Sequence, residues 1–356
     1  MHSSAERNED MKSLQMEDNP NCYLCGKPGE LLYQNLNDRL FGVVGQFNVK
    51  ICKSCRLLWM DPRPSLRDIP KCYENYYTHE DPSDAQFYSN HRTLASLRDN
   101  LRSIILCGLY GYRHLHSRHH FCWLGPALAN IPVLKRRATF DLRERFLPYN
   151  NHKNGLILDI GCGRGDYLKQ MKGLGWNVLG VEPDPVSAQL ARSNGINIFN
   201  GTLGEAELDE ESVDQVTMQH VIEHLIDPLA YVKECYRILK KGGRLVIYTP
   251  NLHSLGHRKF HKSWLALDPP RHLYVFSPQS LKSVFDRSPF RKYQISTSTH
   301  LAKQIYDSSI VISKHGSVKG NATPQKGRVL FSILERIFCL VGLNGGEDIE
   351  AVAWKD

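Results

Sequence analysis

The stretch Leu158-Asp159-Ile160-Gly161-Cys162-Gly163-Arg164-Gly165 decides the fold. An apolar run predicts a strand over 156–160, and the residues after the glycines predict a helix over 167–174. The alternating glycines let the backbone turn tightly and approach a ligand closely. A second predicted strand, 178–181, ends in Glu182, whose carboxylate can accept hydrogen bonds from both hydroxyls of a ribose.

The order of strand, glycine turn, helix, strand and acid predicts a nucleoside site at the edge of an α/β sheet. The spacing is Gly-x-Gly-x-Gly, whereas dinucleotide enzymes use Gly-x-Gly-x-x-Gly, so a pyrophosphate cradle is the lesser interpretation. The remaining alternative is a purely structural turn in another doubly wound fold.

Further apolar runs alternate with helical segments on the C-terminal side of this turn, which predicts a parallel sheet with helices on both faces. The additional predicted strands are 196–199, 213–218, 245–248, 290–297 and 349–354. We divide the chain into a disordered tail (1–20), a zinc-binding module (21–60), a helical linker or lid (61–150), the core (151–299), a helical insertion (300–344) and a final core strand (345–356).

Two Cys-x-x-Cys pairs, Cys22/Cys25 and Cys52/Cys55, predict the zinc module. Four thiolates suit tetrahedral zinc, and a closed four-thiolate site is structural. The alternative is a redox pair or coincidental thiols. The six other cysteines lie among apolar neighbours, which predicts buried free thiols.

Composition is that of an ordinary globular protein, with 41% hydrophobic and 23% charged residues among 356. We find neither a run of eighteen apolar residues nor a secretory leader, so we predict a cytoplasmic protein. Residues 91–147 carry ten Lys and Arg against three acids, a balance of 10 − 3 = +7. This excess predicts an anionic partner, namely a phosphorylated substrate, a nucleic acid or a membrane surface, or simply a solvated helical face.

Five segments together resemble the class I S-adenosylmethionine (SAM)-dependent methyltransferases: LDIGCGRGDYL, VEPDP, MQHVIEHLIDP, LKKGGRLVIYTPN and PPRHLYVFS. The branch most similar includes ubiquinone-biosynthesis O-methyltransferases and bacterial enzymes with an N-terminal four-cysteine module. The resemblance covers about 155–300, and it implies a Rossmann-like seven-stranded sheet.

The resemblance also implies a set of cofactor-binding residues. Asp159, Gly161, Cys162, Gly163 and Gly165 would hold the methionine end of SAM. Glu182 and Pro183 would lie at its ribose, and Thr202 and Leu203 at its adenine, although many family members have an Asp there. Gln219 and His220 would line the sulfonium and the methyl acceptor.

His220, Glu223 and His224 form a His-x-x-Glu-His cluster in which the two histidines, four residues apart, would share one helical face. His220 and Glu223 are candidate catalytic residues, since an imidazole with a pKa of about 6.5 suits a general base. Alternatively, the three residues hold a divalent ion, as the resemblance to some ubiquinone-pathway enzymes with Glu-x-x-Glu-His implies, although their first Glu is His220 here. Zinc-peptidase chemistry is the least favoured option, and for His224 we favour a packed core histidine.

His272 is the second candidate base, in the segment Pro269-Pro270-Arg271-His272. Arg271 could pair with an anionic group of the substrate, and Trp264 and Tyr274 could wall the acceptor pocket. The competing interpretation is a structural loop clamp.

We therefore predict transfer of a methyl group to a hydroxyl of a small-molecule or glycan acceptor, with SAM as cofactor and structural zinc. The alternative is an RNA or protein methyltransferase that uses the zinc module and basic helices to hold its substrate. The segment after 213–218 reads Gln-His-Val and lacks the Asn/Asp-Pro-Pro-aromatic motif of base-amino methylation, which argues against that subset of nucleic-acid targets. A zinc module needs no nucleic acid to explain it, so a nucleic-acid partner is disfavoured. Peripheral membrane contact stays open, and the sequence determines neither the acceptor nor the oligomeric state. A non-catalytic scaffold is disfavoured because the glycine turn and Glu182 are intact.

Overall fold

A computed structural model describes residues 14–74, 92–115, 119–139, 142, 145–149, 155–318 and 322–356. The chain divides into two compact units, Met1–Tyr77 with Met218–Asp356, and Thr78–Thr217. We call them the split unit and the central unit and describe each by itself. Residues 1–13 of the predicted tail lie outside the described residues. The prediction of disorder up to residue 20 is wrong at Met16–Glu17, which form β1 because their backbone pairs with β5 (Arg63–Pro64).

The main sheet has seven strands in the order β12-β13-β10-β9-β6-β7-β8. β6, β7 and β8 run parallel, and β13 runs antiparallel to both of its neighbours. The bounds are β6 Leu156–Ile160, β7 Asn177–Glu182, β8 Ile198–Asn200, β9 Val213–Gln219, β10 Leu239–Pro250, β12 Lys292–Ser298 and β13 Asp348–Trp354. The predicted α/β class with a Rossmann-like seven-stranded sheet is confirmed.

The central unit has its own apolar core, formed where α5 (Asp166–Gly173) and α6 (Pro185–Ser193) pack on β6 and β7. The glycine turn therefore rests on a rigid base. The other helices of this unit are α2 (Arg92–Tyr110), η3 (Arg113–Leu115), η4 (His119–Leu124), α3 (Gly125–Ala129) and α4 (Pro132–Ala138).

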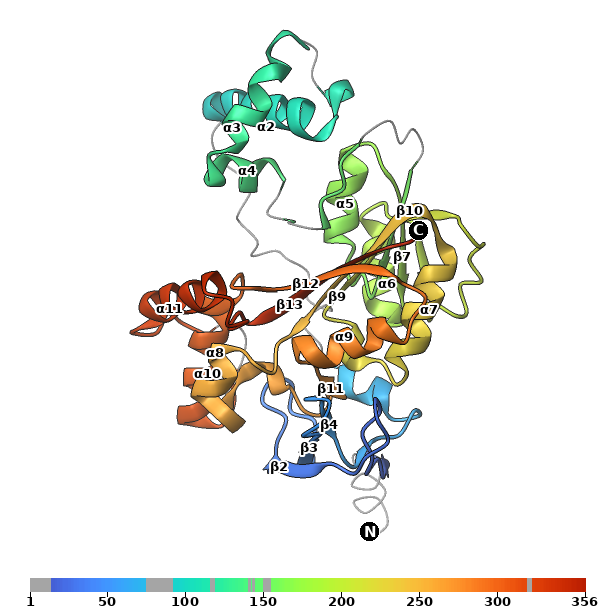
Figure 1. Cartoon of the computed structure of the whole chain (residues 1–356), viewed down its shortest axis with the longest axis vertical. Coiled ribbons are helices and arrows are strands. Elements are labelled where there is room, and N and C mark those ends of the chain that lie inside the picture. The colour runs from blue at the N-terminus through green and yellow to red at the C-terminus, as the bar shows by residue number, and fades with distance from the viewer. Residues whose placement is uncertain are drawn as a thin grey trace, which may run out of the picture. The chain divides into compact units, whose positions relative to one another are not determined.

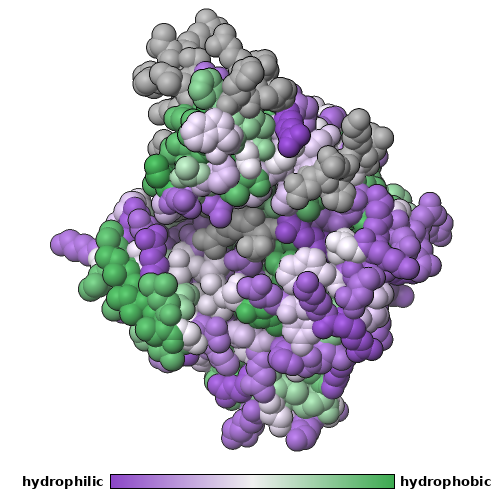
Figure 2. Space-filling model, turned by 45° about the horizontal axis from the view of Figure 1, so that its top comes forward, coloured by the Kyte–Doolittle hydropathy of each residue, from purple (hydrophilic) through white to green (hydrophobic). Residues whose placement is uncertain are grey.

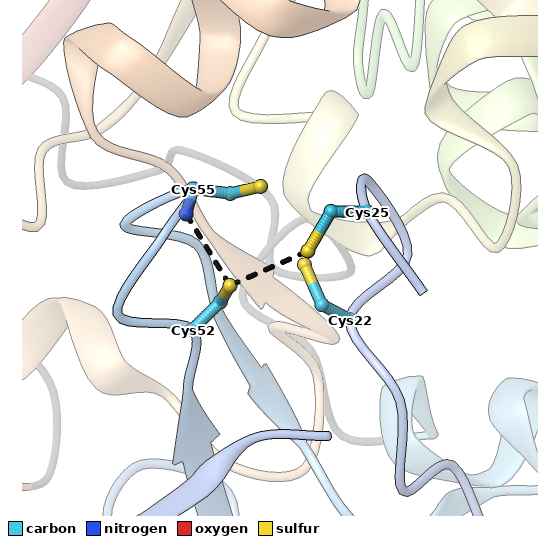
Figure 3. A group of neighbouring side chains, drawn as sticks. All are labelled: Cys22, Cys25, Cys52 and Cys55. Carbon is cyan, nitrogen blue, oxygen red and sulfur yellow. Dashed lines mark hydrogen bonds between the residues drawn. The ribbon is translucent and has the colours of Figure 1, made fainter. Parts of the chain in front are cut away.

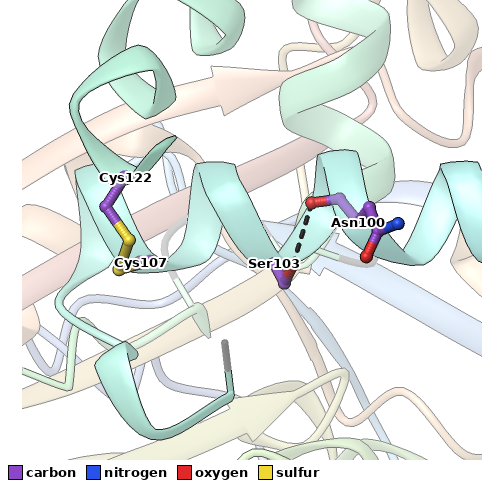
Figure 4. Close-up of a disulfide and its surroundings, with 4 residues drawn as sticks. All are labelled: Asn100, Ser103, Cys107 and Cys122. Atoms are coloured by element: carbon purple, nitrogen blue, oxygen red, sulfur yellow. Dashed lines mark hydrogen bonds between the residues drawn. A yellow bond between two sulfur atoms is a disulfide. The ribbon is translucent and has the colours of Figure 1, made fainter. Parts of the chain in front are cut away.

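Cys107 of α2 and Cys122 of η4 form a disulfide (Figure 4), so the prediction of free thiols is wrong for this pair. Two glycines let α2 approach the segment around Cys122 and Gly125 closely. A Cβ on Gly108 would lie 1.8 Å from the Cys122 carbonyl oxygen, and one on Gly125 would lie 2.6 Å from the Ile104 carbonyl oxygen. The Cα atoms of the cysteines are 5.4 Å apart, within bonding range. Among the other four cysteines, Cys72 and Cys235 are buried as predicted, whereas Cys162 and Cys339 are partly exposed.

The split unit contains a second sheet, β11-β4-β3-β2, which joins the cysteine-rich segment to a short strand from the C-terminal half of the chain (Figure 1). β2 (Glu30–Leu36), β3 (Phe47–Ile51) and β4 (Leu58–Met60) come from the cysteine-rich segment, and β11 (Tyr274–Val275) follows His272. β4 and β11 are antiparallel, with Tyr274 opposite Trp59. The cysteine-rich segment is thus built into the same sheet as the PPRH segment.

The split unit also contains α-helices and short 3-10 helices. They are η1 (Ile69–Tyr73), η6 (Ile222–His224), α7 (Pro228–Ile238), α8 (Leu255–Phe260), η7 (His261–Ser263), η8 (Leu265–Leu267), α9 (Pro278–Asp286), α10 (Ala302–His315) and α11 (Arg328–Leu340). α8, α10 and α11 pack together through Phe260, Tyr306 and Phe331. Over the described residues, we find no helix with the length and apolar character needed to span a bilayer.

Candidate functional site

The glycine turn leaves β6 through three left-handed glycines. Gly161, Gly163 and Gly165 have φ values of 65°, 53° and 78°, which residues with a Cβ rarely adopt. The Gly161 N–H donates to the Val181 carbonyl at 2.8 Å, so the turn is held against β7. α5 begins directly after Gly165. The backbone itself requires glycine at these alternating positions.

Glu182 lies at the end of β7 and contacts the glycine turn directly. Its Oε2 accepts the Gly163 N–H at 2.8 Å, and its Oε1 accepts the Asp184 N–H at 3.0 Å. Burial raises the pKa of Glu182, and these two donors act in the opposite direction. A carboxylate offers about four acceptor positions, so about two are left for the hydroxyls of a ligand.

Asp159 and Cys162 lie on the inner side of this turn. The Thr217 hydroxyl donates to Asp159, and burial raises the pKa of Asp159 to about 6 even though Arg145 lowers it. Cys162 is half-buried, and burial raises its thiol pKa. Its Sγ occupies the space where a Cβ on Gly180 would stand, at 2.4 Å. Cys162 therefore packs the turn onto β7 and is no ready nucleophile.

The turn after β8 carries Thr202 and Leu203. Leu203 is buried, and Thr202 donates from its backbone and its hydroxyl to Glu205 Oε2, at 2.7 and 2.8 Å. Sequence reasoning noted the missing family Asp here but did not single out Glu205. An acid three residues after a predicted turn Thr is the signal that could have found it. Pro183, the other predicted residue near β7, is exposed.

In the split unit, His220 lies just past β9 and Gln219 is exposed beside it. The His220 φ is 53°, and its N–H donates to the Tyr248 carbonyl at 2.9 Å. Only Ile222–His224 is helical, and it is a 3-10 turn. The expectation that His220 and His224 share a helical face is therefore wrong, because the chain turns left-handed at His220.

His220 and Glu223 form a dyad. His220 Nδ1 lies 3.3 Å from Glu223 Oε1, and its Nε2 lies 3.9 Å from Asp348 Oδ1. Glu223 is fully buried, and its Oε2 accepts the Thr249 hydroxyl at 3.0 Å. Burial raises the pKa of Glu223, but the hydrogen bond and charge of His220, and the charges of His224 and His272, lower it to about 2. Glu223 is therefore an anion that orients His220.

His224 and His272 are anchored by backbone carbonyls. His224 Nδ1 lies 2.9 Å from the Arg271 carbonyl oxygen, and His272 Nδ1 lies 2.9 Å from that of Ala266. A carbonyl only accepts, so each Nδ1 carries a proton. Burial, with the charge of His272 second, lowers the pKa of His224 to about 4, so it is neutral at pH 7. The side chain of His272 is only 9% exposed, against 30% for His220, so His220 is the more accessible base.

The group suited to a divalent ion differs from the one that the sequence indicated. Glu223, His224 and His272 place ligand atoms within 4.8 Å of one another, and His220 lies outside this set. His272 Nε2 is 3.9 Å from Glu223 Oε1, whereas ligands on metal bonds of about 2.1 Å lie closer together. A tetrahedral ion here would require Glu223 and His272 to lie closer together than they do.

Arg271 is not available to a substrate, so its predicted pairing with an anionic acceptor group is wrong. It bonds Asp38 through NH1 and NH2 at 2.9 and 2.8 Å, and Asp268 through Nε at 3.0 Å. The side chains of Arg271 and Asp38 are fully buried. Trp264 and Tyr274 are buried too, and Trp264 belongs to an apolar core that includes Phe47. These three predicted pocket residues therefore support the fold.

Sequence reasoning missed two residues that hold His224 and Arg271 in place, Asp38 and Tyr73. The Tyr73 hydroxyl lies 2.9 Å from His224 Nδ1. Asp38 accepts the backbone N–H groups of Leu40, Phe41 and Val43 as well as Arg271. Only the tertiary pairing reveals their role, because each is more than 150 positions from its partner.

The four predicted zinc ligands come together (Figure 3), with their sulfur atoms within 4.8 Å of one another. The two knuckles have the same hydrogen bonds: Cys22 N–H to the Lys27 carbonyl and Cys52 N–H to the Leu57 carbonyl, at 2.8 and 2.9 Å. In each, the fourth residue after the first cysteine is left-handed, Gly26 at 70° and Arg56 at 58°. The Sγ atoms of Cys25 and Cys52 are 3.6 Å apart, close to the ~3.8 Å expected for thiolates on one tetrahedral zinc.

Comparisons with known proteins find methyltransferases. Residues 134–295 match the model of a family described as a methyltransferase domain. A probable S-adenosylmethionine-dependent methyltransferase of Mycolicibacterium smegmatis is 37% identical over 97 residues, 27% of this chain and 38% of that protein. A ubiquinone biosynthesis O-methyltransferase of Dinoroseobacter shibae is 38% identical over 108 residues, 29% of this chain and 44% of that protein.

Among solved structures, a SAM-dependent methyltransferase of Archaeoglobus fulgidus is similar at 23% identity with a TM-score of 0.43, over 67% of this chain and all of that one. The chain spans less than half the length of the curated relatives named above.

Proposed function

We propose that this chain, whose residues 134–295 match a family described as a methyltransferase domain, transfers the methyl group of SAM to a hydroxyl of a small-molecule or glycan acceptor. The observation that carries this proposal is the glycine turn bonded to a buried carboxylate with free acceptor positions. O-methylation is supported by relatives described as ubiquinone biosynthesis O-methyltransferases.

The residues of the central unit suit this cofactor. Asp159, Gly161, Cys162, Gly163 and Gly165 would bind its methionine end, because the left-handed turn brings backbone close to a ligand. Glu182 and Pro183 would meet the ribose. Thr202 and Leu203 would meet the adenine, and the Glu205 carboxylate could accept from its amino group. In the split unit, Gln219 and His220 would face the sulfonium.

Bound SAM supplies an activated methyl group on a cationic sulfur. His220 is the proposed general base: as the acceptor oxygen gains the methyl group, its proton passes to His220 Nε2. Glu223, as an anion behind Nδ1, holds the ring and stabilises the imidazolium. The proton that the acceptor loses in exchange for the methyl group would thus be held on His220, which would later release it to water.

We further propose that Cys22, Cys25, Cys52 and Cys55 bind one structural zinc ion. The matched knuckles and the 3.6 Å sulfur separation support this assignment. Four thiolates would leave no open position on the metal, so zinc would take no part in the chemistry.

Calorimetry with SAM and with its demethylated product tests the proposal. We expect binding by the wild type and about a tenfold or greater loss of affinity in Glu182→Gln, because bonds to a charged acceptor are worth about 1.5–3 kcal/mol. Glu234→Gln is the matched control, since Glu234 bonds Arg237 on α7. No heat with either ligand in metal-replete protein would refute the assignment.

A second assay offers labelled SAM with phenols, monosaccharides, bulk RNA and protein as acceptors. Labelling of a phenol or sugar hydroxyl supports the proposed acceptor class. Labelling of RNA or protein alone would refute it in favour of a macromolecular substrate.

A further inference from the structure

α11 presents its apolar side chains outward. Along Arg328–Leu340, the buried positions are Phe331, Ser332 and Glu335, so two of the three side chains that face the protein are polar. The exposed large apolar side chains of α11 and the three residues after it are Val329, Leu330, Ile333, Leu334, Ile337, Leu340, Val341 and Leu343, between 41% and 86% exposed. We call this set the α11 face.

The exposed positions form one continuous stripe. On a helix of 3.6 residues per turn, 329, 330, 333, 337 and 340 lie on the side opposite Ser332 and Glu335. Figure 2 shows an apolar patch at the left edge of the molecule, on the side where Figure 1 places α11. An apolar patch of this kind on a protein surface marks an interaction site.

The exposed charged residues in the sequence that contains α10 and α11 are positive. Residues 302–343 contain six Lys and Arg and only two acids, Asp307 and Glu335. Both acids are buried, and Asp307 is paired with Arg328. Lys303, Lys314, Lys326 and Arg336 are exposed. An apolar helix face with a cationic surround complements a bilayer that carries anionic headgroups.

We propose that the α11 face docks on the surface of an anionic lipid bilayer. Leu340, the most exposed of its residues at 86%, enters the headgroup boundary first, and the cations lie at headgroup level. A second copy of the chain fits less well, because pairing two such faces would bring like charges together. This inference stands apart from the proposed methyl transfer.

Sedimentation with vesicles tests the docking. We expect the full-length protein to bind vesicles of phosphatidylserine and phosphatidylcholine, and to bind pure phosphatidylcholine much less. Leu330→Glu/Ile337→Glu should lower the partition coefficient at least about tenfold. Lys326→Gln/Arg336→Gln should lower the partition coefficient on the mixed vesicles about fivefold for each charge removed, because each cation near an anionic membrane contributes about 1 kcal/mol. The control, Val44→Glu/Leu66→Glu, changes two exposed apolar residues elsewhere in the split unit and should bind as the wild type does.

A second measurement uses Leu340→Trp, whose added indole fluorescence should shift to the blue when mixed vesicles are present. Wild-type protein that stays in the supernatant with these vesicles overturns the proposal, as does an unshifted emission spectrum of the Leu340→Trp variant. Equal binding by Leu330→Glu/Ile337→Glu also overturns it. A wild-type dimer in analytical ultracentrifugation that this double variant dissociates, without vesicle binding, would assign the face to a second copy instead.

Discussion

Replacing Arg271 by methionine should destabilise the split unit strongly. The guanidinium is fully buried and bonds two buried carboxylates, Asp38 and Asp268. Methionine roughly fills the same space but leaves both carboxylates without their cation. Breaking a buried ion pair by removing one partner costs about 3–5 kcal/mol. We therefore expect Arg271→Met to lower the free energy of unfolding by at least about 3 kcal/mol.

Urea unfolding followed by tryptophan fluorescence measures this loss, since Trp59 and Trp264 are buried in the split unit. The matched control is Arg237→Met, which removes an arginine from a partly exposed pair with Glu234 and should cost about 1 kcal/mol or less. Adding Asp38→Asn and Asp268→Asn to Arg271→Met should recover part of the loss, because the unpaired charges are then gone.

The stability that the Asp38–Arg271 pair contributes depends on pH with a definite sign. Burial raises the pKa of Asp38, but the Arg271 hydrogen bonds and charge outweigh it, so the pKa is lower in the folded protein. Its stabilising contribution is present above about pH 4 and is lost as the pH falls through the folded value. The gap in free energy of unfolding between wild type and Arg271→Met should therefore narrow as the pH falls below about 4. Equal losses in Arg271→Met and Arg237→Met would refute the reasoning.

Three other predictions concern the base, the cysteines and a buried acid. His220→Gln should lower turnover about 10²–10⁴-fold while calorimetry finds SAM affinity unchanged; full activity would eliminate His220 as the base. Cys22→Ser/Cys52→Ser should lose about one zinc ion per chain by metal analysis and lower the melting temperature, whereas Cys235→Ser should retain the metal. Glu335 is buried with neither carboxylate oxygen bonded, and burial, with Glu347 second, raises its pKa to about 9. The folded protein therefore holds a proton that the unfolded chain releases above about pH 4.5, so its stability falls as the pH rises toward 9. We expect Glu335→Gln to raise the free energy of unfolding by about 1–3 kcal/mol at about pH 8, measured in the same urea assay.

The sequence predicted the core of the sheet well because its signals are local. Five-residue apolar runs and alternating glycines depend only on neighbours, and the strand predicted over 156–160 is β6 itself. The turn and Glu182 were found for the same reason. The cluster of four cysteines was found because two short motifs contain all of its members.

The sequence did not predict what depends on distant pairing. Arg271 looks like a substrate contact until Asp38, 233 positions away, is seen to bond it. His272 joins Glu223 and His224 only in the folded chain. The disulfide was missed because no sequence rule shows that Gly108 and Gly125 let two helical segments touch.

The pairing of β4 with β11 has a consequence for synthesis on the ribosome. β4 emerges early, but the strand that covers its open edge, Tyr274–Val275, is made more than 200 residues later. Until then the nascent protein exposes an unpaired strand edge, a template for wrong association. A fragment cut at 134–295 would leave β11 equally unpaired, so expression trials should retain the first 74 residues.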